Sequence, residues 1–202
     1  MKTAQFAPLA CASALLILSA CSNDTAAPPT GEEEETAATL HEVMVEQIDQ
    51  HADELWEISN TALNETAGID PSLLTDAQWD EMAMHAGEVE KGARTLATID
   101  PIVVARPGVK ISDEDIEGGH SAAQVQGFVD ADPQLFRDLS DTLAGHMAQI
   151  VTASRNRDAE ALAPLVDQLD GVCESCHLNY WYPEQRELVE QYQRAGINSP
   201  AE

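Results

Sequence analysis

The sequence predicts an all-α protein, folded as an antiparallel four-helix bundle with one long crossover connection. Apolar residues make up 44% of the 202 residues, enough for a core, whereas aromatic residues make up only 4%. Strand-like runs of Val, Ile, Thr and Tyr are almost absent, so Leu, Ile, Val, Ala and Met must fill this core. Four segments instead repeat apolar residues at helical spacing. Two short connections and one long one join them, which suits a helix bundle.

The first 20 residues are predicted to be a signal peptide that is cleaved off and is not part of the fold. Lys2 gives a positive start, and an apolar stretch follows that is densest at residues 14–18. The stretch is too short to form a stable membrane span and ends in small residues, as a secretory signal does. The letters LSAC at 18–21 resemble a bacterial lipobox, which implies cleavage before Cys21 and lipid attachment to it. A plain cleaved signal is the alternative.

Residues 21–36 are predicted to be a lipid-bearing tether. They combine Cys21 with Pro, Gly, small polar residues and a run of four Glu, a composition that cannot build a core. Fifteen flexible residues would span roughly 20 Å as a random coil, which lifts a domain clear of a membrane surface. The sequence therefore predicts a lipid-anchored domain on the periplasmic side of a bacterial membrane. Ser22, which stands where Asp would retain a lipoprotein in the inner membrane, favours the outer membrane.

The first two helical segments are expected from about 37 to 62 and from Thr75 onward. The stripe of the first consists of Leu40, Met44, Ile48, Leu55 and Ser59, with His51 and Ala52 filling the gap on the same face. Acidic residues occupy its other face, as in an amphipathic helix. Thr75 and Gln78 have the spacing of a capping box at the start of the second segment. The stripe of the second consists of Trp79, Met82, Ala86, Val89, Ala93 and Leu96.

The third and fourth helical segments are expected to begin at Asp132 and near Asp158. Asp132 is a cap residue followed by Pro133 at the first helical position. The stripe of the third segment consists of Phe136, Leu139, Leu143, Met147 and Ile150. The fourth continues through Leu162, Leu165, Val166 and Leu169 to a pair of cysteines. Pro183 is expected to end or bend it.

The long connection runs from about 100 to 131 and is rich in Pro and Gly. A short helix is expected within it at 112–120. The four helices assign the bundle domain to residues 37–183. Residues 184–202 then form a C-terminal tail, with room for a short helix at 184–194.

The charge of the chain is strongly negative, with 36 Asp and Glu against 10 Lys and Arg, a net charge of −26. Nucleic acid is an unsuitable partner, because phosphate binding needs clustered basic residues. A basic redox partner suits this charge, since opposite potentials speed encounter. Solubility of an exported protein explains the acidity equally well. No paired acid and base, nucleophile elbow or phosphate loop is recognisable, so we predict no enzymatic active site.

The residues from Cys173 to His177 read CESCH, the signature of covalent c-type haem attachment. On a helical turn, residues i and i+3 present two thiols to one edge of a porphyrin, where they add across its vinyl groups. His177 can then supply the proximal iron ligand beside Cys176. Three alternatives are a redox cysteine pair, half of a zinc site, and chance. No second Cys or His pair completes a zinc site, and no strand precedes the motif as in thioredoxin-like proteins.

The late position of this motif resembles the class II cytochromes c, the cytochrome c′ group and its low-spin relatives. The resemblance covers roughly 37–183 and includes the letters YWYP at 180–183 after the motif. In the first helix it rests on Met44, Ile48-Asp49, Ala52-Asp53 and Leu55-Trp56. It implies a bundle that carries one haem c. Leu40 departs from the Arg that cytochrome c′ proteins place near the propionates, which leaves Arg94 and Arg106 as guesses for that role.

The role of Met44 decides between the two functions that the resemblance implies. In the low-spin subclass a Met at this place ligates the iron, which gives a periplasmic electron carrier of raised potential. An ordinary core Met44 would leave a five-coordinate haem, typical of a gas-binding module for NO or CO. A bis-His site with His51 and a haem-free redox dithiol are further alternatives. The family also leaves a homodimer open.

The sequence gives weaker indications for the roles of other polar and aromatic side chains. His41 and His120 are expected to be solvated. Trp181, with Tyr180 and Tyr182 on either side, is expected to cap the bundle or to cover the haem edge. Capping is the favoured interpretation.

Overall fold

The computed structural model describes residues 37–65 and 68–194. The regular secondary structure in these ranges is helical, apart from an isolated bridge between Leu63 and Ile69. The all-α prediction is therefore confirmed. The predicted leader and tether, with Cys21, lie outside the described residues. Within the described ranges, no helix has the length and apolar character needed to cross a membrane.

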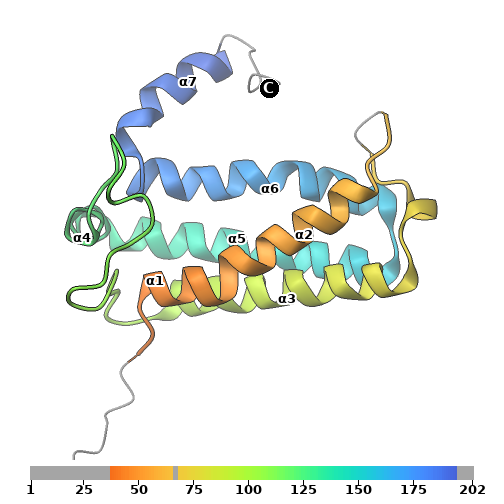
Figure 1. The fold of residues 1–202 in the computed structure, drawn as a ribbon, viewed down its shortest axis with the longest axis horizontal. Coiled ribbons are helices and arrows are strands. Elements are labelled where there is room, and N and C mark those ends of the chain that lie inside the picture. The colour runs from red at the N-terminus through yellow and green to blue at the C-terminus, as the bar shows by residue number, and fades with distance from the viewer. Residues whose placement is uncertain (1–36, 66–67, 195–202) are drawn as a thin grey trace, which may run out of the picture. The chain divides into compact units, whose positions relative to one another are not determined.

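The first predicted helix is present but is not regular. It consists of α1 (Leu40–Val43), a π-helical segment (Met44–Asp49) and α2 (Gln50–Thr61). Figure 1 shows them as one continuous coil. Thr39 caps α1 through a capping box with Glu42. The periodicity predicted a helix correctly, but it could not reveal the π turn, because an extra residue leaves no compositional mark.

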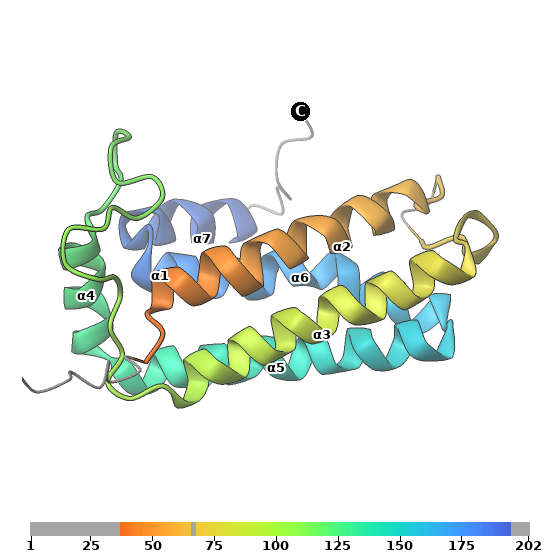
Figure 2. The same ribbon diagram turned by 60° about the horizontal axis from the view of Figure 1, so that its bottom comes forward.

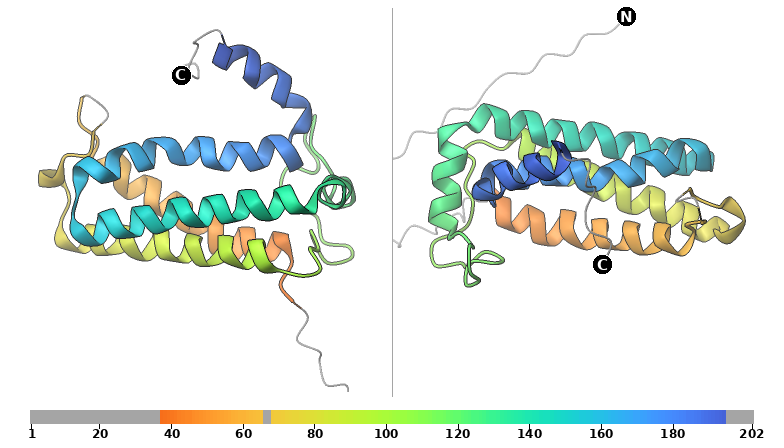
Figure 3. Two further views of the ribbon diagram at one scale, coloured as in Figure 1. Left: turned by 180° about the vertical axis from the view of Figure 1, so that it is seen from behind. Right: turned by 90° about the horizontal axis from the view of Figure 1, so that it is seen from above.

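Three further long helices begin where their caps predicted. They are α3 (Asp76–Thr98), α5 (Pro133–Asn156) and α6 (Ala159–Tyr180). Thr75 and Gln78 form the expected capping box of α3, and the side chains of Asp132 and Asp158 cap α5 and α6. α3 packs against α2 on one side and α5 on the other (Figure 2). α5 in turn lies between α3 and α6 (Figure 3).

The connection between α3 and α5 contains a helix in a different place from the one predicted. Residues 112–120 form turns, and α4 (Ala122–Ala131) follows them. Gly118 has a φ of +83°, and a Cβ on Gly119 would fall 1.8 Å from the carbonyl oxygen of Asp113, so these glycines belong to a tight turn. Ser121 caps α4 instead. The connection stays at one end of the long helices, and α4 runs across that end (Figure 2).

The predicted apolar stripes form the core between the long helices. Every residue of the α3 stripe is buried, and the other helices contribute fully buried Leu55, Phe136, Met147, Ile150, Leu162 and Leu169. Beyond α6 lie a 3₁₀ turn (Pro183–Gln185) and α7 (Arg186–Arg194), which confirms the short helix predicted in the tail. α7 projects away from α6 (Figures 1 and 3).

Candidate functional site

The CESCH motif occupies the last turns of α6. Cys173 and Cys176 are half-buried and form no disulfide. Helical spacing of three residues places both thiols on one side of α6, and both line a single cavity together with His177. The two predicted attachment thiols and the predicted proximal histidine therefore face the same space.

This cavity lies between the first helix, α5, α6 and the long connection. The cavity has a volume of about 220 Å³. Its walls are mainly apolar and include Leu40, Val45, Ile48, Leu96, Val104, Ile111, Val125, Phe136, Leu139, Leu143, Val172 and Trp181. A partly open, mainly apolar cavity with a few polar groups is typical of a cofactor site.

Met44 enters the cavity from the first helix, whereas the cysteines and His177 enter from α6. Met44 is the first residue of the π-helical segment, and Ile48 and Asp49 of the same segment also line the cavity. π turns occur frequently at functional sites. The structure thus brings the predicted sixth ligand to the same cavity as the motif.

Burial affects the protonation of all three side chains of the motif. Burial raises the pKa of Cys173 to about 11 and that of Cys176 to about 12. Desolvation lowers the pKa of His177, against the opposing pull of nearby carboxylates, Asp49 first. A neutral imidazole keeps a lone pair free for a metal. Two thiols one helical turn apart, an imidazole and a thioether in one apolar cavity fit a covalently attached haem.

The cavity joins residues from opposite ends of the chain, so its function depends on tertiary structure. No protein-family model, curated protein or solved structure matches this chain. Within the described part of the chain, no three or more His, Cys, Asp or Glu side chains are arranged to hold a metal ion by themselves. The sulfur and nitrogen donors at the cavity include those of Cys173, Cys176, Met44 and His177, and the walls between them are mainly apolar.

His51 does not line the cavity, although it shares the helical face predicted for Met44. Its Nδ1 lies 2.9 Å from Nδ1 of His85, and the two rings are 5.1 Å apart between their centroids. This hydrogen bond joins α2 to α3. The π turn explains the difference, because an extra residue between Met44 and His51 changes the faces on which they lie. The geometry therefore does not support the bis-His alternative.

The two arginines considered for the propionates are both paired elsewhere. Arg94 binds Glu90 on α3 with a shortest distance of 2.8 Å, and Arg106 binds Glu42 at 2.5 Å. The Arg106 hydrogen bond lowers the pKa of Glu42 to about 2. Neither arginine lines the cavity, whereas Leu40 does. The propionate role assigned to these arginines has no structural support.

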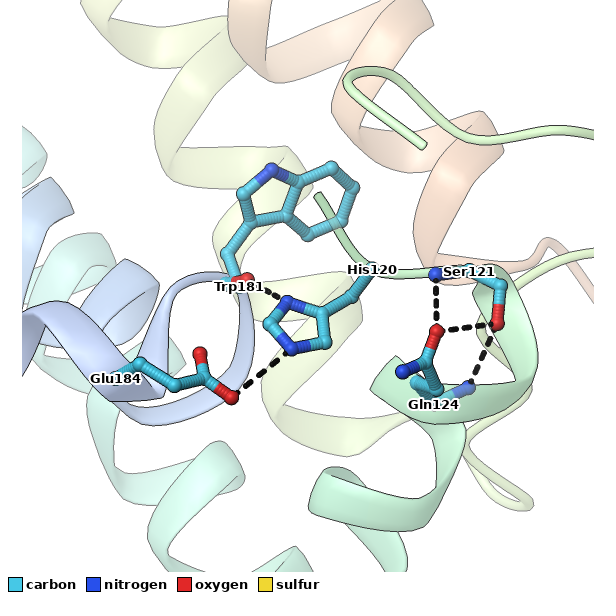
Figure 4. Close-up of polar contacts among 5 residues, drawn as sticks. All are labelled: His120, Ser121, Gln124, Trp181 and Glu184. Carbon is cyan, nitrogen blue, oxygen red and sulfur yellow. Dashed lines mark hydrogen bonds and ion pairs between the residues drawn. The ribbon is translucent and has the colours of Figure 1, made fainter. Parts of the chain in front are cut away.

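His120 is a structural residue that the sequence did not reveal. It was expected to be solvated, but only 10% of its side chain is exposed. Its Nδ1 lies 2.9 Å from the carbonyl oxygen of Trp181, and its Nε2 lies 3.1 Å from a carboxylate oxygen of Glu184 (Figure 4). It thereby holds the long connection against the segment after the motif. No periodicity marks it, because it follows a glycine turn.

The aromatic block after the motif joins helix ends and also lines the cavity. Tyr180 is buried and donates a hydrogen bond of 2.7 Å to the carbonyl oxygen of Asp132, which joins the end of α6 to the start of α5. Tyr182 donates a short hydrogen bond to Asp113. Tyr180 and Trp181 also line the cavity. Capping of the helix ends and covering of the cavity are therefore combined in this block.

Proposed function

We propose that this protein is a monohaem c-type cytochrome that carries electrons. Cys173 and Cys176 would hold the haem through two thioether bonds, His177 would be the proximal ligand, and Met44 the sixth ligand. The observation that carries the proposal is the single apolar cavity that all four side chains line. Among the described residues that line the cavity, Met44 is the only one that offers a thioether sulfur.

The arrangement of the helices supports membership of the class II cytochromes c. The continuous coil of α1 and α2 with α3, α5 and α6 supplies four helices for an antiparallel bundle. The motif lies in the last of these four, as the sequence resemblance implies. The long connection, with α4, closes the end of the helices nearest the motif, and its Ile111, Ser112 and Asp113 line the cavity.

The chemistry of the cavity suits electron transfer rather than substrate turnover. A bound haem would supply one-electron redox chemistry. The thioether of Met44 is a soft ligand and, with His177, favours a raised potential. The apolar walls keep water from the site, which further tunes the potential.

The predicted leader and the negative charge of the chain indicate its location and its partners. We propose that lipid on Cys21 anchors the domain on the periplasmic side of the outer membrane. An acidic surface suits a redox partner with a basic surface, because complementary potentials speed encounter. Nucleic acid remains unsuitable as a partner for a chain of net charge −26.

The visible absorption spectrum of the purified full-length protein, with and without carbon monoxide, tests the proposal. The reduced protein should show sharp low-spin bands and should bind carbon monoxide poorly. A pyridine-haemochrome assay should give one haem c per chain. Rapid binding of carbon monoxide would favour the five-coordinate gas-binding module instead. A chain without haem, with Cys173 and Cys176 oxidised, would favour the redox dithiol.

A further inference from the structure

Gly92 lies in the C-terminal half of α3 and is buried against the π-helical segment. A Cβ at this position would lie 3.0 Å from Cγ1 of Ile48 and 3.3 Å from Cβ of Gln47. Glycine in a helix interior is unfavourable relative to alanine, so its presence here is explained by this close approach. Gly87, on the same helix, has no such neighbour, because its Cβ would meet only Val151 at 4.0 Å.

The π-helical segment is a conformation that needs support from its surroundings. π-helices are rare and occur mostly as single turns within α-helices. In this segment the side-chain oxygen of Gln47 is buried and has no hydrogen-bond partner among the described residues. A buried polar atom without a partner is costly. Gln47 and Ile48 pack on the bare backbone of Gly92, where an added Cβ would lie within 3.3 Å of both side chains.

The π turn also determines which side chain the first helix presents to the cavity. One residue of an α-helix corresponds to about 100° of rotation. If the extra residue were lost, the chain before Ile48 would rotate relative to α2 by about this angle. Met44 would then leave the cavity wall that it shares with Ile48. The π turn and the position of Met44 are therefore linked.

We propose that Gly92 is a positioning residue for the iron ligand Met44. The absence of a side chain at position 92 lets the π-helical segment lie against α3, and that contact holds Met44 in the cavity wall. The inference rests on the proposed function, because the position of Met44 has a spectroscopic consequence only if its sulfur ligates the iron. It adds a residue that lies outside the cavity and that no ligand motif includes.

Gly92→Ala, with Gly87→Ala as the matched control on the same helix, tests the inference in the haem-loaded full chain. Both substitutions add one methyl group to α3, but only the first one meets Ile48. Gly92→Ala should give a mixture of low-spin and high-spin haem and at least tenfold faster carbon monoxide binding. Gly87→Ala should keep the wild-type spectrum. Identical spectra for Gly92→Ala and wild type would overturn the inference.

A double-mutant cycle with Met44→Leu separates positioning from a general loss of structure. In the Met44→Leu background, Gly92→Ala should change the carbon monoxide binding rate by less than twofold, because the ligand is already gone. Residues that act through a shared partner are non-additive in this way. Equal effects of Gly92→Ala in both backgrounds would show that position 92 acts independently of Met44, and would reject the proposal.

Amide hydrogen exchange of residues 44–49 provides a readout that does not depend on the haem. Exchange there should be at least tenfold faster in Gly92→Ala and unchanged in Gly87→Ala. Unchanged exchange in Gly92→Ala would overturn the inference. A wild-type spectrum without Met ligation would instead overturn the proposed function. If Gly92→Ala does not accumulate, Gly92→Ala/Ile48→Ala should match Ile48→Ala in spectrum, and a difference between these two would contradict the steric route.

Discussion

Cys173, Cys176 and His177 acquire their chemical character from the walls of the cavity. Burial keeps the two thiols protonated, with pKa values of about 11 and 12, so they are weak nucleophiles toward general reagents. Both thiols lie at the wall of a cavity that His177 and Met44 also line. Their helical spacing and their buried surroundings together place both thiols at this cavity.

Met44→Leu tests the ligand at the scale of one side chain. Leu nearly conserves the volume of Met, so the free energy of unfolding should fall by less than about 1.5 kcal/mol. The iron would lose its soft sixth ligand, so the haem should become high-spin, its potential should fall, and carbon monoxide should bind rapidly. Absorption spectroscopy and redox titration measure these changes. An unaltered spectrum would show that Met44 only packs.

His51→Ala is the matched control for that substitution. His51 bonds to His85 and does not line the cavity, so its loss should leave the spin state unchanged. Removal of one hydrogen bond between α2 and α3 should cost about 0.5–1.5 kcal/mol of unfolding free energy. A change of spin state in His51→Ala would revive the bis-His alternative.

Gly87→Ala tests the propensity of α3 at the scale of one element. Its added Cβ would make only an ordinary contact with Val151 at 4.0 Å. Alanine is favoured over glycine in a helix interior, so the substitution should stabilise the protein by about 0.4–1 kcal/mol. Urea unfolding monitored by circular dichroism measures the difference. Destabilisation would show that α3 tolerates no added volume at position 87, which would weaken its use as a control for Gly92.

His120→Ala tests how the long connection is attached to the end of α6. The substitution removes the interactions with Trp181 and Glu184 and the edge-on contact with Phe128, whose ring centroid is 5.2 Å away. We expect the free energy of unfolding to fall by about 1–3 kcal/mol and proteolysis within residues 105–121 to become faster. His120→Gln should recover part of the protection, since its amide can replace one hydrogen bond. Unchanged proteolysis in His120→Ala would contradict this attachment.

Cys21→Ala tests the location of the whole molecule. One acyl chain gives marginal membrane binding and two give stable anchoring, so a lipidated Cys21 should hold the protein firmly. The substitution should yield soluble periplasmic protein or unprocessed precursor, and haem attachment at Cys173 and Cys176 should continue. Cell fractionation and intact mass measure the outcome. Wild-type protein recovered as soluble material without lipid mass would contradict the lipobox interpretation.

Much of the fold could be predicted because its signals are local. Thr75 with Gln78, and Asp132 with Pro133, mark helix starts through hydrogen bonds and backbone preferences within a few residues. The helix predicted at 112–120 was wrong, because Gly118 and Gly119 form a turn there and Ser121 caps α4 after it. Helix propensity is a weak signal wherever turn chemistry competes with it.

The sequence by itself determined the helical class, the starts of the long helices and the spacing of Cys173, Cys176 and His177, because each depends on neighbours along one helix. Only the tertiary structure decided that Met44 shares a cavity with that motif while His51 bonds to His85. The physical reason is the π turn at residues 44–49, which packs against Gly92 of α3. One extra residue in a helical turn rotates all the preceding side chains relative to those that follow, and local sequence does not mark it.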